Sequence, residues 1–234
     1  MKAISLIGNS KSGKTTLALE LCSYFRSLDL RVGYAKHSSH GFDLRDTDTQ
    51  RLSEQAQAVA GVSPDQSMVL WSGQRYLLDL VPLLQSDVLI IEGGRELKVL
   101  PRILLPKAED HEDRQLDQDL ALASWKRQID AQLPVMDHIQ ELGEYVLARG
   151  FLLPGLNCGA CGRESCAHLA GEIVSGTASI DDCRALQGSM SIRINGQPLG
   201  LNPFAAGIVS GSIRGMLEQL KGYAPGTIDI SLET

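Results

Sequence analysis

Three features are absent from this sequence, and each absence excludes a class of protein. No apolar run is long enough to cross a bilayer as a helix, so we expect no contact with a membrane. Positive charge is not in excess, because 22 Lys and Arg face 28 Asp and Glu and the net charge is -6, so we expect no nucleic-acid partner. The first residues contain no signal-peptide pattern, so we expect a cytoplasmic location.

The 234 residues suffice for one large domain or two. In the first half, short apolar runs alternate with segments of helical periodicity, which indicates an α/β fold with a mostly parallel sheet covered by helices on both faces. In such a sheet the ligand binds at the carboxyl ends of the strands. The predicted strands are 2–7, 31–37, 87–93, 102–105 and 119–124, and the predicted helices are 14–28, 48–60, 74–85 and 136–149.

Residues 8–15 read GNSKSGKT and match the phosphate-loop motif G-x-x-x-x-G-K-[ST]. They lie between a predicted strand and a predicted helix, the context that this motif requires and that a chance Gly/Ser turn carrying a lysine would lack. Gly8 and Gly13 let the backbone N–H groups point at phosphate oxygens. Lys14 would reach the β- and γ-phosphates, and the Thr15 hydroxyl would ligate Mg²⁺. The sequence therefore predicts a nucleoside triphosphate site.

Two further segments place polar residues beside this loop. Glu92 lies near the carboxyl end of the predicted strand 87–93. A carboxylate at this place suits a water-mediated contact to Mg²⁺ or the orientation of an attacking water. The usual residue there is Asp, so the role of Glu92 stays open, and an exposed strand-end Glu is the alternative. Segment 36–48, KHSSHGFDLRDTD, can supply a metal ligand, a base and an anion contact. We expect a polar or phosphate-facing role for His37 and His40, not metal binding.

A break in the pattern at LLPGL, residues 152–156, predicts a domain boundary near residue 150. Residues 1–150 would form the phosphate-loop domain and residues 151–234 a small α+β domain. The latter is predicted to contain a helix at 167–175, a hairpin within 191–201, a long helix at 203–221 and a strand at 227–232. These elements make a thin core, for which a bound inorganic cluster would compensate.

Four of the five cysteines fall within 26 residues, with the spacing C-x₂-C-x₄-C-x₁₆-C. In a cytosolic chain this clustering favours metal or cluster ligation over disulfides. Three close cysteines and a distant fourth fit a [4Fe–4S] cube better than the paired knuckles of a Zn²⁺ site, which is the alternative. The fifth, Cys22, is interpreted as a small buried apolar side chain. The predicted ligands are Cys158, Cys161, Cys166 and Cys183.

Residues 1–105 resemble the MobB family, molybdopterin-guanine dinucleotide biosynthesis protein B, in the motifs GNSKSGKTT, KHSSHGFD, DTDTQR and DVLIIEG. The resemblance implies a GTP-binding P-loop protein that accompanies the enzyme joining GMP to molybdopterin. No guanine-selecting N-K-x-D element is visible, so GTP over ATP rests on the resemblance alone. Gly94 and Arg95 stand where the family has an aromatic residue and a lysine. The resemblance implies that the phosphates are held by Gly8, Asn9, Ser10, Lys11, Ser12, Gly13, Lys14, Thr15 and Thr16, with Asp43, Asp48 and Glu92 near Mg²⁺ and the γ-phosphate.

The cysteine segment is similar to the [4Fe–4S] domains of the corrinoid iron–sulfur protein's large subunit and of the RnfB electron-transport subunit. The leading hypothesis is therefore a slowly hydrolysing, GTP-binding adapter for molybdenum or tungsten cofactor assembly that carries a cluster. Its partner would be the guanylyltransferase or a molybdoenzyme apoprotein, and the family resemblance implies a homodimer. No nucleophile, general base or arginine finger is identifiable, so a weak GTPase is expected.

Two other functions are compatible with parts of the sequence. An electron-transfer protein whose cluster is gated by nucleotide is the main alternative. A small-molecule kinase ranks last, because its lid would be rich in arginine, whereas residues 105–118 contain only Lys107 and Arg114 against five acids.

Overall fold

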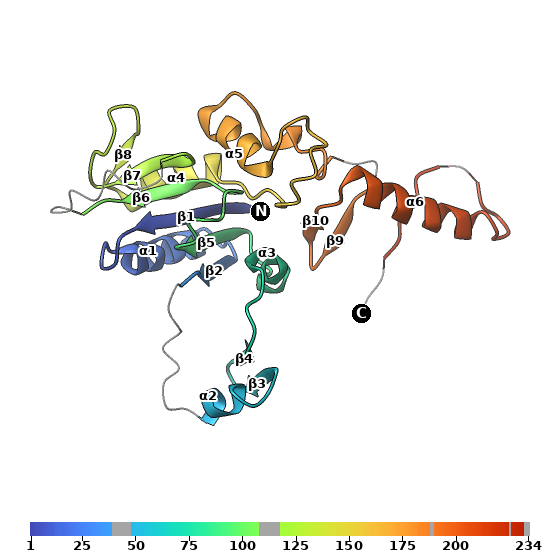
Figure 1. The fold of residues 1–234 in the computed structure, drawn as a ribbon, viewed down its shortest axis with the longest axis horizontal. Helices are drawn as coiled ribbons and strands as arrows, with labels where there is room; N and C mark the ends of the chain where they lie inside the picture. Colours follow the sequence, from blue (N-terminus) through green and yellow to red (C-terminus); the bar gives the residue numbers. More distant parts are fainter. Residues whose placement is uncertain (39–47, 108–117, 188–189, 225, 232–234) are drawn as a thin grey trace.

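The computed structural model describes residues 1–38, 48–107, 118–187, 190–224 and 226–231 (Figure 1). Its centre is a six-stranded sheet in which each neighbouring pair is parallel. Five of the six strands are those predicted, so the parallel α/β sheet is confirmed. The order across the sheet is β2 (Val32–Lys36), β5 (Val88–Glu92), β1 (Lys2–Gly8), β6 (Arg102–Leu105), β7 (Ala121–Trp125) and β8 (Val135–Met136).

Alternate residues of the central strands pack on opposite faces of the sheet, because successive side chains of a strand point to opposite sides. Val88 and Ile90 of β5 pack in one hydrophobic cluster with α1 (Lys14–Ser27) and α4 (Ile139–Arg149). Leu89 and Ile91 pack in another, with the short helix η1 (Val81–Leu84) and α5 (Cys166–Ser175). Both faces are covered, as predicted. No helix in the described part of the chain is long and apolar enough to cross a membrane.

Three predicted helices of the first half differ from those observed. The helix predicted at 48–60 is wrong beyond α2 (Asp48–Ser53), because residues from Ala58 onward form a hairpin of β3 (Ala58–Val62) and β4 (Ser67–Trp71). Gly61 disfavours a helix, and a short apolar run cannot be assigned by periodicity alone. The prediction at 74–85 is interrupted, with α3 (Leu77–Leu80) followed by the 3₁₀ helix η1. The third, at 136–149, begins only at Ile139 of α4.

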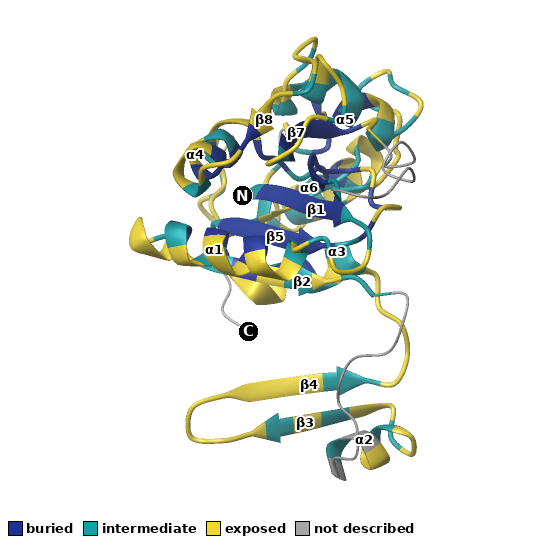
Figure 2. Ribbon diagram, turned by 90° about the vertical axis from the view of Figure 1, so that its left-hand side faces the viewer, coloured by how far each residue is buried: buried dark blue, intermediate teal, exposed yellow. Residues whose placement is uncertain are grey.

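This hairpin and α2 lie away from the body of the molecule, and most of the hairpin is exposed (Figure 2). We refer to residues 48–72 as the arm. In the second half, α5 is confirmed, and so is the hairpin of β9 (Ile192–Ile194) and β10 (Gln197–Leu199), which turns at Asn195 and Gly196. The predicted long helix is α6 (Pro203–Leu217). The predicted strand at 227–232 is wrong over residues 227–231, which pair with no strand of the described chain.

The division of the chain near residue 150 stays a prediction. One hydrophobic cluster has members from both sides of it, because Leu153, Leu169 and Cys183 pack with Ala3 and Leu89 of the central sheet. The cysteine segment therefore shares a core with the phosphate-loop sheet. In contrast, the β9–β10 hairpin and α6 extend to one side (Figure 1).

An ion pair between Arg31 and Asp87 joins the amino-terminal ends of β2 and β5, with the Arg31 Nη2 and Asp87 Oδ1 atoms 2.8 Å apart. Hydrogen bonds from the Arg31 side chain and backbone lower the pKa of Asp87 to about 2. A lowered folded-state pKa stabilises the protein above the unfolded value near 4, and this stabilisation is lost as the pH falls through 2.

Asp87→Asn should therefore lower the midpoint of thermal unfolding at pH 7, by only about a degree or two because the pair is exposed. The difference from the wild type should disappear between pH 4 and pH 2. Circular dichroism melts across this range measure it, and a difference that persists at pH 2 would exclude the ion pair as its cause.

Candidate functional site

The phosphate loop, residues 8–15, connects β1 to α1 at the carboxyl edge of the sheet. It folds tightly against β6, since a Cβ atom added to Gly8 would lie 2.6 Å from the carbonyl oxygen of Leu105. The Lys14 ammonium spans the loop and donates to the carbonyl oxygens of Gly8, at 3.0 Å, and Asn9, at 2.7 Å. Lys14 thus lies over the space that a phosphate would enter.

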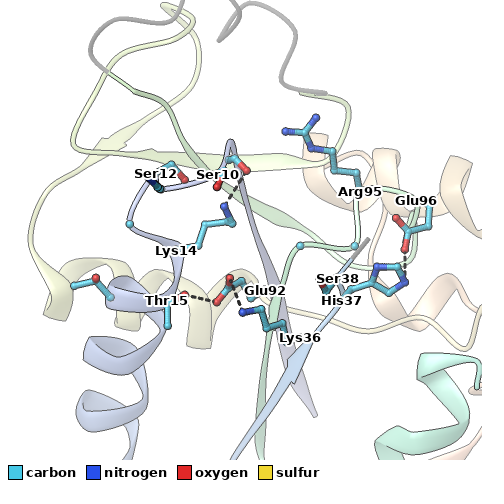
Figure 3. A pocket seen from close by; sticks show the side chains of 16 residues that line it. Ser10, Ser12, Lys14, Thr15, Lys36, His37, Ser38, Glu92, Arg95 and Glu96 are labelled. Atoms are coloured by element: carbon cyan, nitrogen blue, oxygen red, sulfur yellow. Dashed lines mark hydrogen bonds and ion pairs between the residues drawn. The ribbon is translucent and has the colours of Figure 1, made fainter. Parts of the chain in front are cut away.

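A cavity of about 820 Å³ opens above the loop (Figure 3). In the figure the labelled loop residues Ser10 and Ser12 lie on one side and His37, Arg95 and Glu96 on the other, with Lys14 and Glu92 between them. Its walls are Gly8, Ser10, Lys11, Ser12, Gly13, Lys14, Thr15 and Thr16, together with residues 36–38 and 92–96.

Glu92 lies at the floor of this cavity, at the carboxyl end of β5, and is only 8% exposed. Its Oε2 atom accepts hydrogen bonds from the Thr15 hydroxyl at 2.8 Å and from the Tyr34 hydroxyl at 2.7 Å. The Lys36 ammonium lies 4.0 Å from Oε1. Burial acts to raise the pKa of Glu92, but these hydrogen bonds and the charges of Lys36 and Lys14 outweigh it and lower the pKa. The group is therefore an ionised carboxylate and a weak base.

The cavity has a shortage of negative charge around its lysine. Burial lowers the pKa of Lys14, the Glu92 carboxylate opposes this, and the neighbouring cations Arg95, Lys107 and Lys36 lower it further. An anion bound here would neutralise these cations and favour the charged form of Lys14. The electrostatics therefore favour an anionic ligand.

Arg95 is a site residue that the sequence pattern did not assign. Gly93 and Gly94 have φ values of +83° and +75°, which L side chains rarely adopt, and they turn the chain back toward the loop. The Arg95 guanidinium then donates from Nη2 to the Asn9 Oδ1 atom at 3.1 Å. The buried Arg102 side chain donates to the Arg95 carbonyl oxygen from below. The departure from the family at Gly94 and Arg95 is the signal that could have pointed to this residue.

The predicted site residues fall into three groups. The eight wall residues of the loop and α1 surround the cavity, with Glu92 beside Thr15, and Asn9 contacts both Lys14 and Arg95. Asp43 and His40 lie outside the described residues. Asp48 is the first residue of α2, in the arm, and its side chain is likewise outside the description. Tyr34 was missed, because a tyrosine facing outward on an edge strand has no motif of its own.

The four clustered cysteines line one small cavity beside α5. Cys183 is buried and Cys158 is exposed, with Cys161 and Cys166 between these extremes. The backbone N–H of Asn157 donates to the Cys166 sulfur at 3.4 Å. The pKa of the Cys183 thiol is raised, because burial disfavours the thiolate. The N–H groups of Ala185 and Leu186 point at its sulfur and offset part of this increase.

These features fit an iron–sulfur cluster. Four thiols surround one space, and backbone N–H groups aimed at their sulfur atoms are the interactions that tune such clusters. Within the described ranges, no three His, Cys, Asp or Glu side chains converge as the ligands of one metal ion do.

The sheet order and the loop after β1 define an α/β protein with a P-loop-type fold. The chain belongs to the MobB family: the family model described as "Molybdopterin guanine dinucleotide synthesis protein B" matches residues 3–125. A second model, described as "Putative Fe-S cluster", matches residues 153–185 and so contains all four clustered cysteines. The predicted family and its carboxyl-terminal iron–sulfur domain are confirmed.

A similar protein from Methanocaldococcus jannaschii (strain ATCC 43067 / DSM 2661 / JAL-1 / JCM 10045 / NBRC 100440) is named "Putative molybdopterin-guanine dinucleotide biosynthesis adapter protein". It is 31% identical over 242 residues, covering 100% of this chain and 98% of that protein. Two structures of Bacillus subtilis MobB share the fold, with TM-scores of 0.54 and 0.51 and sequence identities of 19% and 18%. Each match covers 64% of this chain and 99% of the other.

Proposed function

We propose that this chain is a GTP-binding, slowly hydrolysing adapter in the biosynthesis of molybdopterin guanine dinucleotide and that it carries a [4Fe–4S] cluster. The observation that supports nucleotide binding best is the contact of 2.8 Å between the Thr15 hydroxyl and the Glu92 carboxylate at the floor of the cavity. Bound Mg²⁺ would neutralise charge on the β- and γ-phosphates. Thr15 would ligate it directly, and Glu92 would hold one of its waters.

The residues around the phosphates support binding more than rapid chemistry. Glu92 is held by Thr15 and Tyr34, and its lowered pKa makes it a poor general base. Among the described residues of the walls, the other candidate bases are His37 and Glu96, which pair with each other, with the His37 Nε2 atom 2.9 Å from the Glu96 carboxylate. No side chain there combines a nucleophile with a free base, so hydrolysis should be slow and nucleotidyl transfer should belong to a partner enzyme.

Arg95 supplies the charge that a phosphoryl-transfer site needs beside its lysine. Its guanidinium is hydrogen-bonded to Asn9 of the loop and lines the cavity that the phosphates would enter. We expect Arg95→Ala to lower the rate of GTP hydrolysis by about tenfold to a hundredfold, because arginines in this role stabilise the charge of the transition state. Single-turnover hydrolysis with purified protein measures this effect.

Arg75→Ala is the matched control for Arg95, because Arg75 lies just beyond the arm, with its guanidinium 5.5 Å from the ring of Trp71. It removes the same charge outside the cavity walls and should leave hydrolysis unchanged. Equal rates for the wild type and Arg95→Ala would remove Arg95 from the mechanism.

Calorimetric titration tests the nucleotide assignment. GTP should bind with micromolar or tighter affinity in the presence of Mg²⁺ and more weakly with EDTA, since the Thr15–Glu92 pair has its role only around the ion. The adapter role is tested separately, by gel filtration of an equimolar mixture with the molybdenum cofactor guanylyltransferase. A chain that binds GTP but never co-elutes with that enzyme would retain the nucleotide assignment and lose the adapter role.

Anaerobic purification followed by iron and sulfide analysis tests the cluster. Four iron and four sulfide per chain are expected for a [4Fe–4S] cluster, with an EPR signal in the reduced state. Stoichiometric zinc without iron would contradict the assignment.

One observation favours the alternative, an electron-transfer protein gated by nucleotide. The segment that follows Glu92 and Arg95 continues into Leu97, Val99 and Leu100, which pack in the same hydrophobic cluster as Cys183. This shared core is the part of the structure through which a change at the phosphates would have to reach the cysteine segment. A shift of the cluster's reduction potential when GTP binds would favour this function, and an unchanged potential would favour the adapter alone.

A further inference from the structure

A second cavity, of about 340 Å³, borders the phosphate loop on the side away from Glu92. It shares Ser12, Gly13 and Thr16 with the phosphate cavity, so the two spaces meet at the loop. The rest of its wall comes from α1, from the end of β6 and from the end of β7. None of its described wall residues belongs to segments 36–38 or 92–96, which form the far side of the phosphate cavity.

The sheet order sets the direction in which a nucleotide would lie. If Thr15 and Glu92 hold Mg²⁺ as proposed, the γ-phosphate end lies beside β5, which flanks β1 on one side. β6 and β7 lie on the other side of β1. From β5 to β7 there are three interstrand spacings, roughly 14 Å, which an extended nucleoside triphosphate bridges. The base must therefore leave the loop toward the second cavity.

The chemistry of this cavity suits an aromatic base. The Lys126 ammonium lies 5.1 Å from the centre of the Trp125 ring, and both residues line the wall. Lys126 has a φ of 63°, an uncommon conformation for a residue with a side chain, and its N–H donates to the Met136 carbonyl oxygen at 2.8 Å. The Trp125 ring, with the Lys126 cation beside it, offers a surface on which a base can stack. The unusual backbone conformation of Lys126 is of the kind that often occurs at ligand sites.

We propose that the second cavity holds the base and ribose of the nucleotide, with Trp125 and Lys126 as the stacking surface and Glu20 as the acceptor that selects guanine. This inference rests on the proposed binding of GTP. Glu20 is the one carboxylate among the described residues of the wall. Guanine offers two adjacent N–H donors, at N1 and N2, whereas adenine offers an acceptor at N1. The Arg127 guanidinium, also on the wall, suits the O6 and N7 acceptors of guanine.

Tryptophan fluorescence gives a direct test, because the chain contains only two tryptophans. In Trp71→Phe, which alters the arm alone, Trp125 is the single tryptophan, and its emission can be excited selectively over that of the five tyrosines. GTP should quench or shift its emission, whereas inorganic tripolyphosphate should bind without that change. Trp125→Ala and the surface variant Lys126→Ala should each weaken GTP binding by about tenfold and leave tripolyphosphate binding unchanged. Glu20→Gln should lower the preference for GTP over ATP by a similar factor.

Three outcomes separate the possibilities. The inference is correct if the emission responds to GTP alone and the variants lose affinity for GTP alone. It is overturned if GTP and tripolyphosphate both bind but Lys126→Ala and Trp125→Ala keep their GTP affinity within twofold. If neither ligand binds the wild-type chain, the proposed nucleotide function fails as well.

Discussion

Replacing Lys14 with alanine is expected to weaken the binding of both GTP and tripolyphosphate by at least about a hundredfold. The ammonium lies over the loop, and in the complex it would exchange the carbonyl oxygens of Gly8 and Asn9 for phosphate oxygens. Truncating one partner of a desolvated, hydrogen-bonded charge pair costs about 2–5 kcal/mol, and a hundredfold change in affinity corresponds to about 2.7 kcal/mol. Calorimetric titration of both ligands at one salt concentration measures the effect.

Lys2→Ala is the matched control, because Lys2 begins β1 at the opposite end of the strand and its ammonium donates to the Ala148 carbonyl oxygen. It should bind both ligands as the wild type does. The combination of ligands separates this prediction from the base-pocket variants: Lys14→Ala should lose both, whereas Lys126→Ala should lose GTP alone. An unchanged affinity of Lys14→Ala for tripolyphosphate would contradict the placement of the phosphates on the loop.

Loss of the cluster is expected to destabilise the sheet as well as the cysteine segment. Cys158→Ser removes an exposed ligand, so its effect on stability should come from the lost cluster and not from lost packing. Iron content should fall sharply, and the midpoint of thermal unfolding should drop by on the order of 10 °C, because ligation free energy contributes to folding. Cys183→Ser should lose iron to the same extent and destabilise the protein further, since Cys183 is buried in the hydrophobic cluster that also contains Ala3 and Leu89.

Cys22→Ser is the control for both cysteine variants. Cys22 packs against the opposite hydrophobic cluster, with α1 and α4, and should retain full iron content. Metal analysis together with anaerobic calorimetry measures all three variants. A Cys158→Ser protein that has lost its iron but melts at the wild-type temperature would show that the cluster contributes nothing to the shared core.

The parts of the fold that could be predicted from the sequence are those whose local residue pattern is compatible with only one type of secondary structure. β1 and β5 are continuous apolar runs, as strands buried on both faces must be, and the loop between β1 and α1 is a motif with a single geometry. The segment at Ala58–Val62 has no such pattern, because a short apolar run fits a helix and a strand equally. Pairing with β4, which follows directly after the turn at residues 63–66, decides it in favour of a strand.

The candidate site divides in the same way. Lys14, Thr15 and the four cysteines are predicted from spacing, because phosphate and metal ligation require those residue types at those intervals. Tyr34, Arg95 and Trp125 could not be predicted in this way, since each contacts or shares a cavity with residues that lie far away in the chain. Tyr34 meets Glu92 because β2 and β5 are adjacent, and Arg95 reaches Asn9 because two glycines turn the chain back.

By itself, the sequence determined the class of this protein: a phosphate loop on a parallel sheet, the motifs of the MobB family and four cysteines at cluster spacing. Those features are local, and their chemistry depends on intervals along the chain. Only the tertiary structure decided that the cysteine segment shares a core with the sheet, and that a cavity with Trp125 and Lys126 adjoins the loop. Both depend on which strands lie side by side, and strand order is determined by the burial of faces over the whole chain.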